Sequence, residues 1–256
     1  MPLARWLVLA VWFFVSNASA SAQDKKLTIR WYGQSFFQIT TSSGTRVVFD
    51  PHAIEQYPRQ IVPADLVLIS HPHLDHATLN YIPNRDKAKI IAGITGTARR
   101  QEFVPVDETF RDCRIWNVSL FHDKDNGMLR GRNAAFVVEV DGVRICHLGD
   151  LGHELNDRQL KKIGPVDILM IPIGGIYTLN GTDARAVVDQ IRPRRLVLPM
   201  HYGTKAFQEL LGPEEFLEGL AGVERKRKTN ELVLDLNSVI PPQPRVVLLG
   251  WTTEGD

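Results

Sequence analysis

The stretch LVLISHPHLDH, residues 66–76, holds the densest group of metal-ligand side chains in this sequence. Its first four residues form a short apolar run typical of a buried strand, so the ligand-rich part begins where a loop is expected. Imidazole and carboxylate ligands together suit zinc, iron and manganese. One tetrahedral site would not take four ligands from one loop, so the spacing predicts two ions: His71 and His73 directed at one, Asp75 and His76 at the other. A histidine-rich loop without a cation is disfavoured, because crowding three imidazoles together costs free energy.

Short apolar runs bounded by turn residues recur along the chain. The expected strands cover residues 27–31, 36–40, 46–49, 65–70, 89–92, 114–118, 135–140, 143–146, 166–172 and 195–200. Helices are expected to begin at Asn156, Thr182 and Pro213, and the polar segment before Lys89 is a further candidate helix. Strands precede helices in each half, which predicts two sheets packed together with helices outside, a four-layer αββα sandwich. No linker separates the halves, so residues 23–256 are expected to form one domain.

Residues 1–22 have the pattern of a secretory signal peptide. Arg5 precedes the apolar run 6–15, small residues follow, and cleavage after Ala20 or after Ala22 fits equally well. The apolar run is short for a membrane span, which disfavours an uncleaved anchor, and no other segment is long and apolar enough to cross a bilayer. The sequence therefore predicts an exported protein, either periplasmic or secreted.

The charge balance gives no reason to expect a nucleic-acid partner. Removing residues 1–22 lowers the basic residues from 30 to 29, which equals the 29 acidic residues. A neutral chain has no overall attraction to a polyanion. The basic run 225–228 is flanked by Glu224 and Glu231, so we interpret it as a solvated face.

The two cysteines, Cys113 and Cys146, leave two possibilities open. An exported chain permits a disulfide between them. Cys146 lies in an apolar, strand-like run, however, so a pair of buried free thiols is the alternative. Neither residue belongs to a C-x-x-C pair, which disfavours a metal bound through cysteine.

Further potential ligands follow predicted strands. Asp150 comes shortly after the strand at 143–146, and His201 comes directly after the strand at 195–200. Ligands converge at such strand ends in proteins that combine sheets and helices. The eight histidines of the chain are at positions 52, 71, 73, 76, 122, 147, 153 and 201.

In its motifs and their order, the chain resembles the metallo-β-lactamase fold hydrolases. It is most similar to the branch that contains L-ascorbate-6-phosphate lactonase-like and N-acylphosphatidylethanolamine phospholipase D-like proteins. The matching features, within residues 27–205, are Asp50-Pro51, the H-x-H-x-D-H run at 71–76, His122, Gly149-Asp150 and His201. The resemblance implies the αββα fold and two divalent ions, with zinc favoured and manganese or iron as alternatives. It implies that one ion is held by His71, His73 and His122, the other by Asp75, His76 and His201, and that Asp150 lies between them.

Three histidines compete for the third position at the first ion. His122 is favoured by its order in the chain and its place at a strand end. Strand alternation places His147 on the face opposite Asp150, and His153 lies three residues beyond that carboxylate. His147 and His153 are therefore interpreted as supporting residues.

Three other polar residues are expected to support the ligands. Asp123 is interpreted as a carboxylate that caps its own loop, although it adjoins His122 and could bind metal. Asp50 and His52 are expected to orient ligand imidazoles from behind, with a plain turn at Asp50-Pro51 as the alternative.

The segment 130–133, Arg-Gly-Arg-Asn, falls between His122 and Asp150. A guanidinium there is suited to a phosphate or carboxylate, so Arg130 and Asn133 are predicted to bind substrate, with a solvated hairpin as the alternative. Tyr177 follows two glycines and is predicted to reach the cleft as a hydrogen-bond or proton donor, with a packed loop aromatic as the alternative.

The predicted activity is metal-dependent hydrolysis of a phosphodiester, lactone or other ester, with a small-molecule or lipid-like substrate. A hydroxide between the two cations is the expected nucleophile, and Asp75 is the expected catalytic residue that orients it or moves a proton. The G-x-S-x-G motif of serine hydrolases is absent. Two alternatives are an iron-dependent oxidoreductase on the same fold and a non-catalytic metal-binding protein. The lack of an appended redox module weighs against the first, and the complete ligand set weighs against the second.

Overall fold

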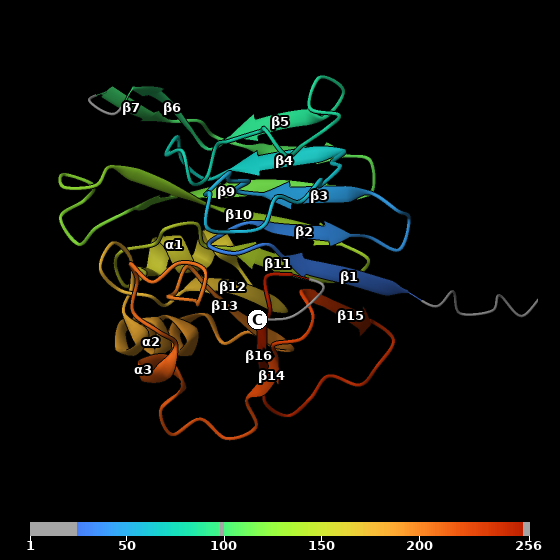
Figure 1. Ribbon diagram of the computed structural model, residues 1–256, viewed down its shortest axis with the longest axis vertical. Helices are drawn as coiled ribbons and strands as arrows, with labels where there is room; N and C mark the ends of the chain where they lie inside the picture. The colour runs from blue at the N-terminus through green and yellow to red at the C-terminus, as the bar shows by residue number, and fades with distance from the viewer. Residues whose placement is uncertain (1–24, 98–99, 253–256) are drawn as a thin grey trace, which may run out of the picture.

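Alternating apolar residues build the first sheet of the computed structural model, which describes residues 25–97 and 100–252 (Figure 1). In spatial order its strands are β15 (Glu231–Asp235), β1 (Lys26–Trp31), β2 (Phe37–Thr40), β3 (Arg46–Phe49), β4 (Leu66–Ile69) and β5 (Lys89–Ala92). The strands from β15 to β3 are antiparallel to their neighbours, whereas β3, β4 and β5 run parallel. The carboxyl ends of β3 and β4 therefore lie side by side.

The second sheet contains most of the long apolar runs. Its order is β14 (Glu224–Lys226), β16 (Arg245–Leu249), β13 (Leu196–Met200), β12 (Ile168–Pro172), β11 (Val143–His147), β10 (Arg132–Val140), β9 (Cys113–Phe121) and β8 (Asp107–Phe110). Every residue of β12 and β13 is buried, as expected for central parallel strands with both faces covered. A separate two-stranded ribbon, β6 (Ile94–Thr97) with β7 (Arg100–Phe103), was not predicted.

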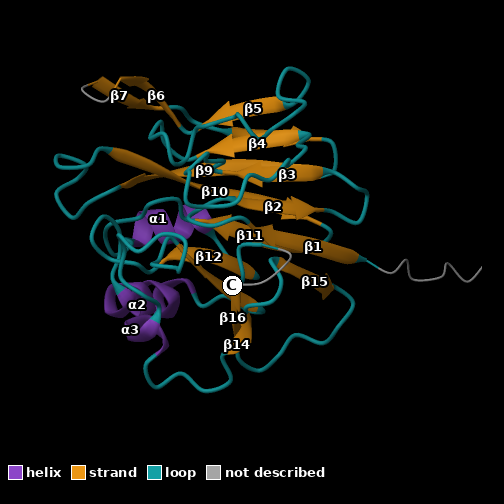
Figure 2. Ribbon diagram, in the orientation of Figure 1, coloured by secondary structure: helices purple, strands orange, loops and turns teal. Residues whose placement is uncertain are grey.

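The two sheets pack face to face, and strand alternation assigns each side chain to a layer. In β4, Leu66 and Leu68 join the main core between the sheets, whereas Val67 and Ile69 join a smaller cluster on the outer face. Helices α1 (Asp157–Ile163), α2 (Gly181–Ile191) and α3 (Glu214–Leu217) lie together beside the second sheet (Figure 2). Two sheets packed together with helices outside the second one are consistent with the predicted αββα sandwich.

The outer layer on the first sheet departs from the prediction. The polar segment before Lys89, a candidate helix, forms turns instead. Pro83 lies within it, and the side chain of Asn84 both accepts from Ala64 N and donates to Ala64 O, at 3.0 and 2.6 Å. A side chain that satisfies the backbone in this way competes with helix formation. The small outer cluster is therefore covered by irregular chain.

The helix that follows Asn156 agrees with the prediction. The Asn156 side chain accepts from Gln159 N while the Gln159 side chain accepts from Asn156 N, a complete capping box. Gly164 ends the helix with a positive φ of 73°. No helix within residues 25–97 and 100–252 has the length and apolar character needed to span a bilayer.

Two other expectations from the sequence have different outcomes. Cys113 and Cys146 are buried free thiols, and burial raises the pKa of each to about 12. The second of the two alternatives for the cysteines is therefore the one the structure has. The predicted signal peptide at 1–22 lies outside the described residues.

Candidate metal centre

The ligand-rich loop after β4 is fixed from behind by Asp50, at the end of the parallel neighbour β3. The two Asp50 carboxylate oxygens accept from Ser70 N at 2.7 Å and from Ser70 Oγ at 2.6 Å. The Nδ1–H of His76 donates to the same carboxylate at 2.9 Å. In the neutral ring, which is the form that binds metal, this contact keeps the proton on Nδ1 and leaves the lone pair of Nε2 free for a cation.

The same hydrogen bonds set the ring of His71. Because Ser70 Oγ donates to Asp50, it can accept from Nδ1–H of His71, which lies 2.8 Å away. The unprotonated Nε2 of His71 then points toward His73, whose Nδ1 is 3.0 Å from it. Two ring nitrogens this close together are well placed to share a cation.

One oxygen of Asp150 is the meeting point of the cluster. Its Oδ2 atom lies 3.0 Å from Nε2 of His122, 3.1 Å from that of His76, 3.2 Å from that of His201 and 4.0 Å from that of His71. Potential ligand atoms within 4.8 Å of one another form three groups in the described residues. Two share no residue: His71, His73 and His122 in one, and Asp75, His76, Asp150 and His201 in the other. The third, Asp50 with His71 and His76, overlaps both. The structure thus brings all seven predicted ligands together in the predicted two groups.

His122 enters the cluster where β9 ends, and two contacts orient it. Its Nδ1–H donates to Tyr177 O at 3.1 Å, which leaves Nε2 facing Asp150. The backbone of His122 also passes directly over Gly152. A Cβ on that glycine would lie 2.5 Å from the carbonyl carbon and oxygen of His122, so only glycine permits this approach.

His201 follows β13 in a left-handed conformation, with φ at 48°. Its backbone N–H donates to Gln34 O at 3.2 Å, and its carbonyl accepts from Gly174 N at 3.0 Å. A Cβ on Gly174 would lie 2.2 Å from that carbonyl oxygen. The loop after β12 can therefore approach His201 only because residue 174 is glycine.

The electrostatics of the cluster favour a cation. Burial and the neighbouring His76 hold the pKa of His71 well below its usual value, so that ring is neutral, as a metal ligand must be. Burial opposes the charged form of His76, but the carboxylates of Asp150, Asp75 and Asp50 outweigh it and raise the pKa of His76 well above its usual value. Nε2 of His76 is buried and makes no hydrogen bond. A buried ring nitrogen that faces carboxylates and has no hydrogen-bond partner fits a metal ion.

The other histidines lie outside the cluster and brace the chain behind it. His147 is fully buried, its Nε2–H donates to Ser35 O at 2.9 Å, and its Nδ1 accepts from Gly149 N. His153 accepts at Nε2 from Phe121 N, just before His122. His52 donates to Gly33 O at 3.2 Å rather than to a ligand imidazole.

The predicted substrate residues have different positions. Arg130 and Tyr177 line a cavity of about 450 Å³ whose floor is the cluster, but Asn133 is fully buried and does not. Its side-chain oxygen accepts from Asp150 N at 3.1 Å, and its amide donates to Leu148 O at 2.8 Å. The prediction that Asn133 binds substrate disagrees with this geometry, because alternation along β10 turns its side chain inward. Asn133 instead supports the turn that carries Asp150.

Asp123 has the loop-capping position expected of it. Its carboxylate oxygens accept from four backbone N–H groups, those of residues 125, 127, 129 and 130, at 2.7–3.1 Å. These bonds shape the loop between β9 and β10 into a compact turn beside the cavity. None of its oxygens belongs to the clustered ligand sets found in the described residues.

Several residues of the site were not found from the sequence. Ser35 donates from Oγ to Oδ1 of Asp150 at 3.3 Å, across a separation of 115 residues. Gln101, Met128 and Leu129 line the cavity. Nothing in the sequence near Ser35 indicates its contact with Asp150.

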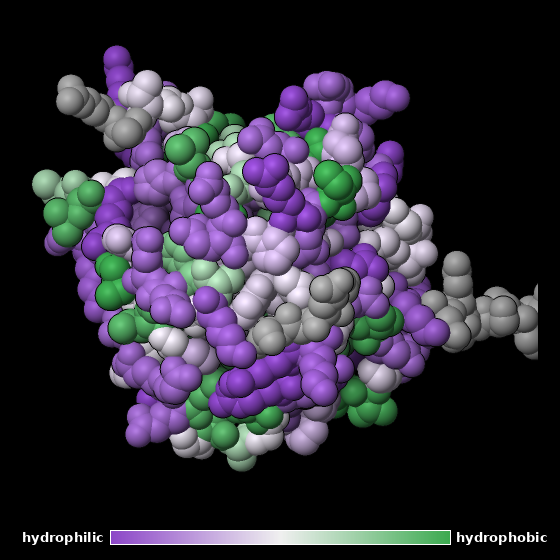
Figure 3. All heavy atoms as spheres, viewed as in Figure 1, coloured by the Kyte–Doolittle hydropathy of each residue, from purple (hydrophilic) through white to green (hydrophobic). Residues whose placement is uncertain are grey.

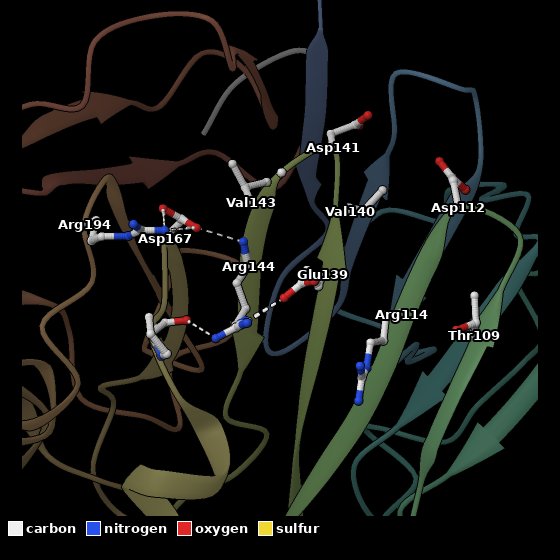
Figure 4. Close-up of a pocket in the computed structure, with 12 residues that line it drawn as sticks. Thr109, Asp112, Arg114, Glu139, Val140, Asp141, Val143, Arg144, Asp167 and Arg194 are labelled. Atoms are coloured by element: carbon white, nitrogen blue, oxygen red, sulfur yellow. Dashed lines mark hydrogen bonds and ion pairs between the residues drawn. The ribbon is translucent and has the colours of Figure 1, made fainter.

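A second cavity, of about 550 Å³, lies at the opposite end of β10 and β11 (Figure 4). Four of its charged groups are paired with one another: Arg144 with Glu139, and Arg194 with Asp167. Asp167 also accepts from Arg144 N at 2.9 Å. None of the clustered groups of potential metal ligands in the described residues lies here, and the paired charges hold strand ends together.

Comparison with known families agrees with this geometry. A profile described as "Beta-lactamase superfamily domain" matches residues 28–201, more than half of the chain. The chain belongs to this superfamily. The "UPF0173 metal-dependent hydrolase" of Thermococcus onnurineus is 33% identical over 198 residues, which cover 69% of this chain and 84% of that protein. A protein of the same name from Anaeromyxobacter sp. (strain K) is 31% identical, and the match covers 86% of this chain and 92% of that protein.

Solved structures give the same assignment. A Thermotoga maritima protein, described as a proposed Zn-dependent hydrolase of the metallo-beta-lactamase superfamily, matches with a TM-score of 0.66 and 30% identity over 88% of this chain and 98% of its own. The predicted family and fold are confirmed, and the chain is a metal-dependent hydrolase of this superfamily. A diiron β-hydroxylase from Streptomyces venezuelae, CmlA, matches at 17% identity and a TM-score of 0.52, and this likeness shows the fold alone.

The close approach of His122 to Gly152 leads to a testable prediction. In Gly152→Ala the new methyl would collide with backbone, so we expect a loss of about 1–3 kcal/mol in unfolding free energy and less bound metal. Gly142→Ala is the matched control: that glycine has open space around it and a φ of +82°, so alanine there costs about 1–2 kcal/mol of backbone strain. The control should lose stability but keep its metal. Thermal unfolding and elemental analysis of both variants test this, and full metal content in Gly152→Ala would contradict it.

Proposed function

We propose that this chain uses a pair of divalent cations, with zinc favoured, to hydrolyse an ester bond in a small molecule. Phosphodiesters, lactones and other acyl esters are the substrate classes, with lipid-like esters among them. One observation carries the proposal: ring nitrogens of four histidines from three chain segments lie within 4.0 Å of a single buried oxygen of Asp150. Two sets of ligands around one shared carboxylate oxygen suit a pair of cations.

When bound, such ions would lower the pKa of a water molecule and polarise the carbonyl or phosphoryl oxygen of the substrate. Zinc suits this set of imidazole and carboxylate ligands, and manganese and iron are the alternatives.

Asp75 is the residue best placed to orient the attacking water. Its carboxylate lines the cavity, and Oδ2 lies 3.5 Å from Nε2 of His76. Burial opposes its ionisation, but the neighbouring His76 outweighs this effect and lowers the pKa of Asp75 to about 2. An ionised carboxylate at this position can accept a hydrogen bond from water and so orient it.

Arg130 and Tyr177 line the same cavity as His73 and Asp75 of the metal loop. Nη2 of Arg130 donates to Ile176 O at 2.9 Å, and its guanidinium lies 5.7 Å from the centre of the Tyr177 ring. The guanidinium still has donors for a carboxylate or phosphate oxygen of the substrate. We propose that Arg130 binds an anionic group next to the scissile bond.

The location of the enzyme is a separate proposal. The pattern of residues 1–22, a basic residue followed by an apolar run and small residues, supports export to the periplasm or the medium. Expression of the full chain with fractionation of the cells, and sequencing of the mature amino terminus, tests it. An unprocessed protein that stays in the cytoplasm would contradict export.

The catalytic proposal is tested by removing and restoring metal. Protein dialysed against dipicolinate is expected to lose hydrolysis of whichever member of a panel it cleaves: bis-p-nitrophenyl phosphate, an aryl lactone, p-nitrophenyl acetate or a thioester. Adding Zn²⁺, Mn²⁺ or Fe²⁺ back singly identifies the active metal, and elemental analysis of the protein as purified counts the ions. Unchanged hydrolysis by protein shown to be free of metal would contradict the proposal.

A further inference from the structure

Large apolar side chains that should be buried are exposed around the mouth of the metal cavity. Twelve such side chains are exposed in the described part of the chain, and half of them belong to the segments around the cavity. They are exposed by between 46% and 85%, and together we name them the apolar collar: Leu74, Met128, Leu129, Ile176, Tyr177 and Leu211. Contiguous exposed apolar surface marks a site of interaction more often than chance exposure does.

The collar comes from separate segments that meet at one place. Met128, Leu129 and Tyr177 line the cavity directly, and Leu74 lies between two residues that line it. Leu211 donates from its backbone N–H to Gly174 O at 2.9 Å, beside the loop that carries Ile176. Figure 3 shows apolar atoms at the left edge of the molecule, over the loop that joins β9 and β10 in Figure 1.

Polar contacts hold the collar open. The carboxylate of Asp123 fixes the backbone of the loop from 125 to 130, so Met128 and Leu129 are presented outward. The hydrogen bond from Arg130 to Ile176 O ties that loop to the opposite one. The exposed side chains are therefore part of an ordered wall, and their exposure costs free energy that binding an apolar group would recover.

We propose that the substrate carries an apolar alkyl or acyl chain, which lies against the collar while the ester reaches the metals. This rests on the proposed ester hydrolysis and narrows its substrate class to amphiphilic esters. Three collar residues, Met128, Leu129 and Tyr177, line the cavity itself, and Arg130 lines it beside them. This arrangement matches a molecule with a chain at one end and a polar or anionic group at the other.

The dependence of kcat/KM on the length of the substrate's alkyl or acyl chain tests the proposal directly. The substrates are p-nitrophenyl acetate, butyrate, hexanoate and octanoate, or the matching alkyl p-nitrophenyl phosphodiesters, each below its micelle-forming concentration. Burying one methylene strengthens binding by roughly threefold to fourfold. We therefore expect kcat/KM to rise by about that factor for each added CH2 until the substrate chain covers the collar. The enzyme is the metal-loaded full chain.

Collar variants then assign the effect to these residues. Met128→Ser and Leu129→Ser are expected to lower the ratio of octanoate to acetate kcat/KM by roughly tenfold each, since each removes most of a large apolar contact. Val239→Ser is the matched control, because Val239 is 91% exposed and lies outside the cavity lining. It should leave the ratio as in the wild type. The ratio does not depend on the fraction of active enzyme, so partial misfolding of a variant does not disguise the result.

The outcomes separate this inference from the function on which it rests. Equal kcat/KM for all chain lengths, with acetate hydrolysed, would overturn the collar proposal and leave ester hydrolysis standing. An unchanged ratio in both collar variants would also overturn it, even if the variants altered self-association or binding to phosphatidylcholine–phosphatidylglycerol vesicles. No hydrolysis of any ester or phosphodiester by the metal-loaded enzyme would overturn both proposals.

Discussion

Asp150→Asn is expected to lower kcat/KM by roughly a thousandfold or more, because it removes the one charge that faces both ligand sets. Asp150 is buried, and its Oδ2 atom is within 3.2 Å of three imidazole nitrogens. An asparagine has nearly the same shape but no charge, and only its Oδ1 atom has lone pairs with which to bind a cation or accept a hydrogen bond. We expect elemental analysis to find less than the wild-type metal content, together with the loss of activity on the panel substrate.

A matched control separates this effect from damage to the fold. Asp167 is another buried aspartate, held by Arg194 and by the backbone of Arg144 at the far end of the same sheet (Figure 4). Asp167→Asn should lose stability, because it weakens a buried charge pair, but should keep its metal and its kcat/KM. If Asp150→Asn retained wild-type metal and activity, a centre with a shared carboxylate would be the wrong description of this site.

The residues of the site that could be predicted from the sequence belong to short local patterns. The loop at 71–76 is a local motif, and His122, Asp150 and His201 each follow a recognisable strand. Since strand ends converge at one edge of a sandwich, position along the chain was enough to bring them together. The supporting role of His147 was also predicted, because its spacing from Asp150 directs it away from the ligands, and its Nε2–H donates to Ser35 O.

The parts that the sequence missed depend on contacts between distant segments. The bond between Ser35 and Asp150 is set by how the two sheets pack, and no local pattern records it. Asn133 was misread because its strand is buried on both faces, so polarity did not indicate exposure. The apolar collar was missed for the opposite reason: Met128 and Leu129 look like core residues, and only the hydrogen-bonded loop around Asp123 shows that they are held outward.

Asp50→Asn is expected to weaken metal binding by about 10- to 100-fold while leaving the fold largely intact. Asp50 has a left-handed backbone, with φ at 44°, which asparagine tolerates well. The effect should come through His76, whose Nδ1–H now donates to the carboxylate at 2.9 Å. An amide NH2 at that position would need to donate to Nδ1, and the ring proton would move to Nε2. The nitrogen that faces Asp150 would then lose the lone pair it needs for a cation.

This prediction tests whether Asp50 sets the tautomer of the His76 ring or only holds the backbone of the metal loop. Asp65→Asn is the control, because Asp65 lies at the other end of β4 and pairs with Arg46 at 3.0 Å, away from the metal loop. Both variants should fold, and thermal unfolding measures how much stability each has lost. Titration with Zn²⁺ against a competing chelator should show weaker binding only in Asp50→Asn. Equal affinity in both variants would mean that His76 keeps its tautomer without Asp50, and that the carboxylate serves only to hold Ser70 in place.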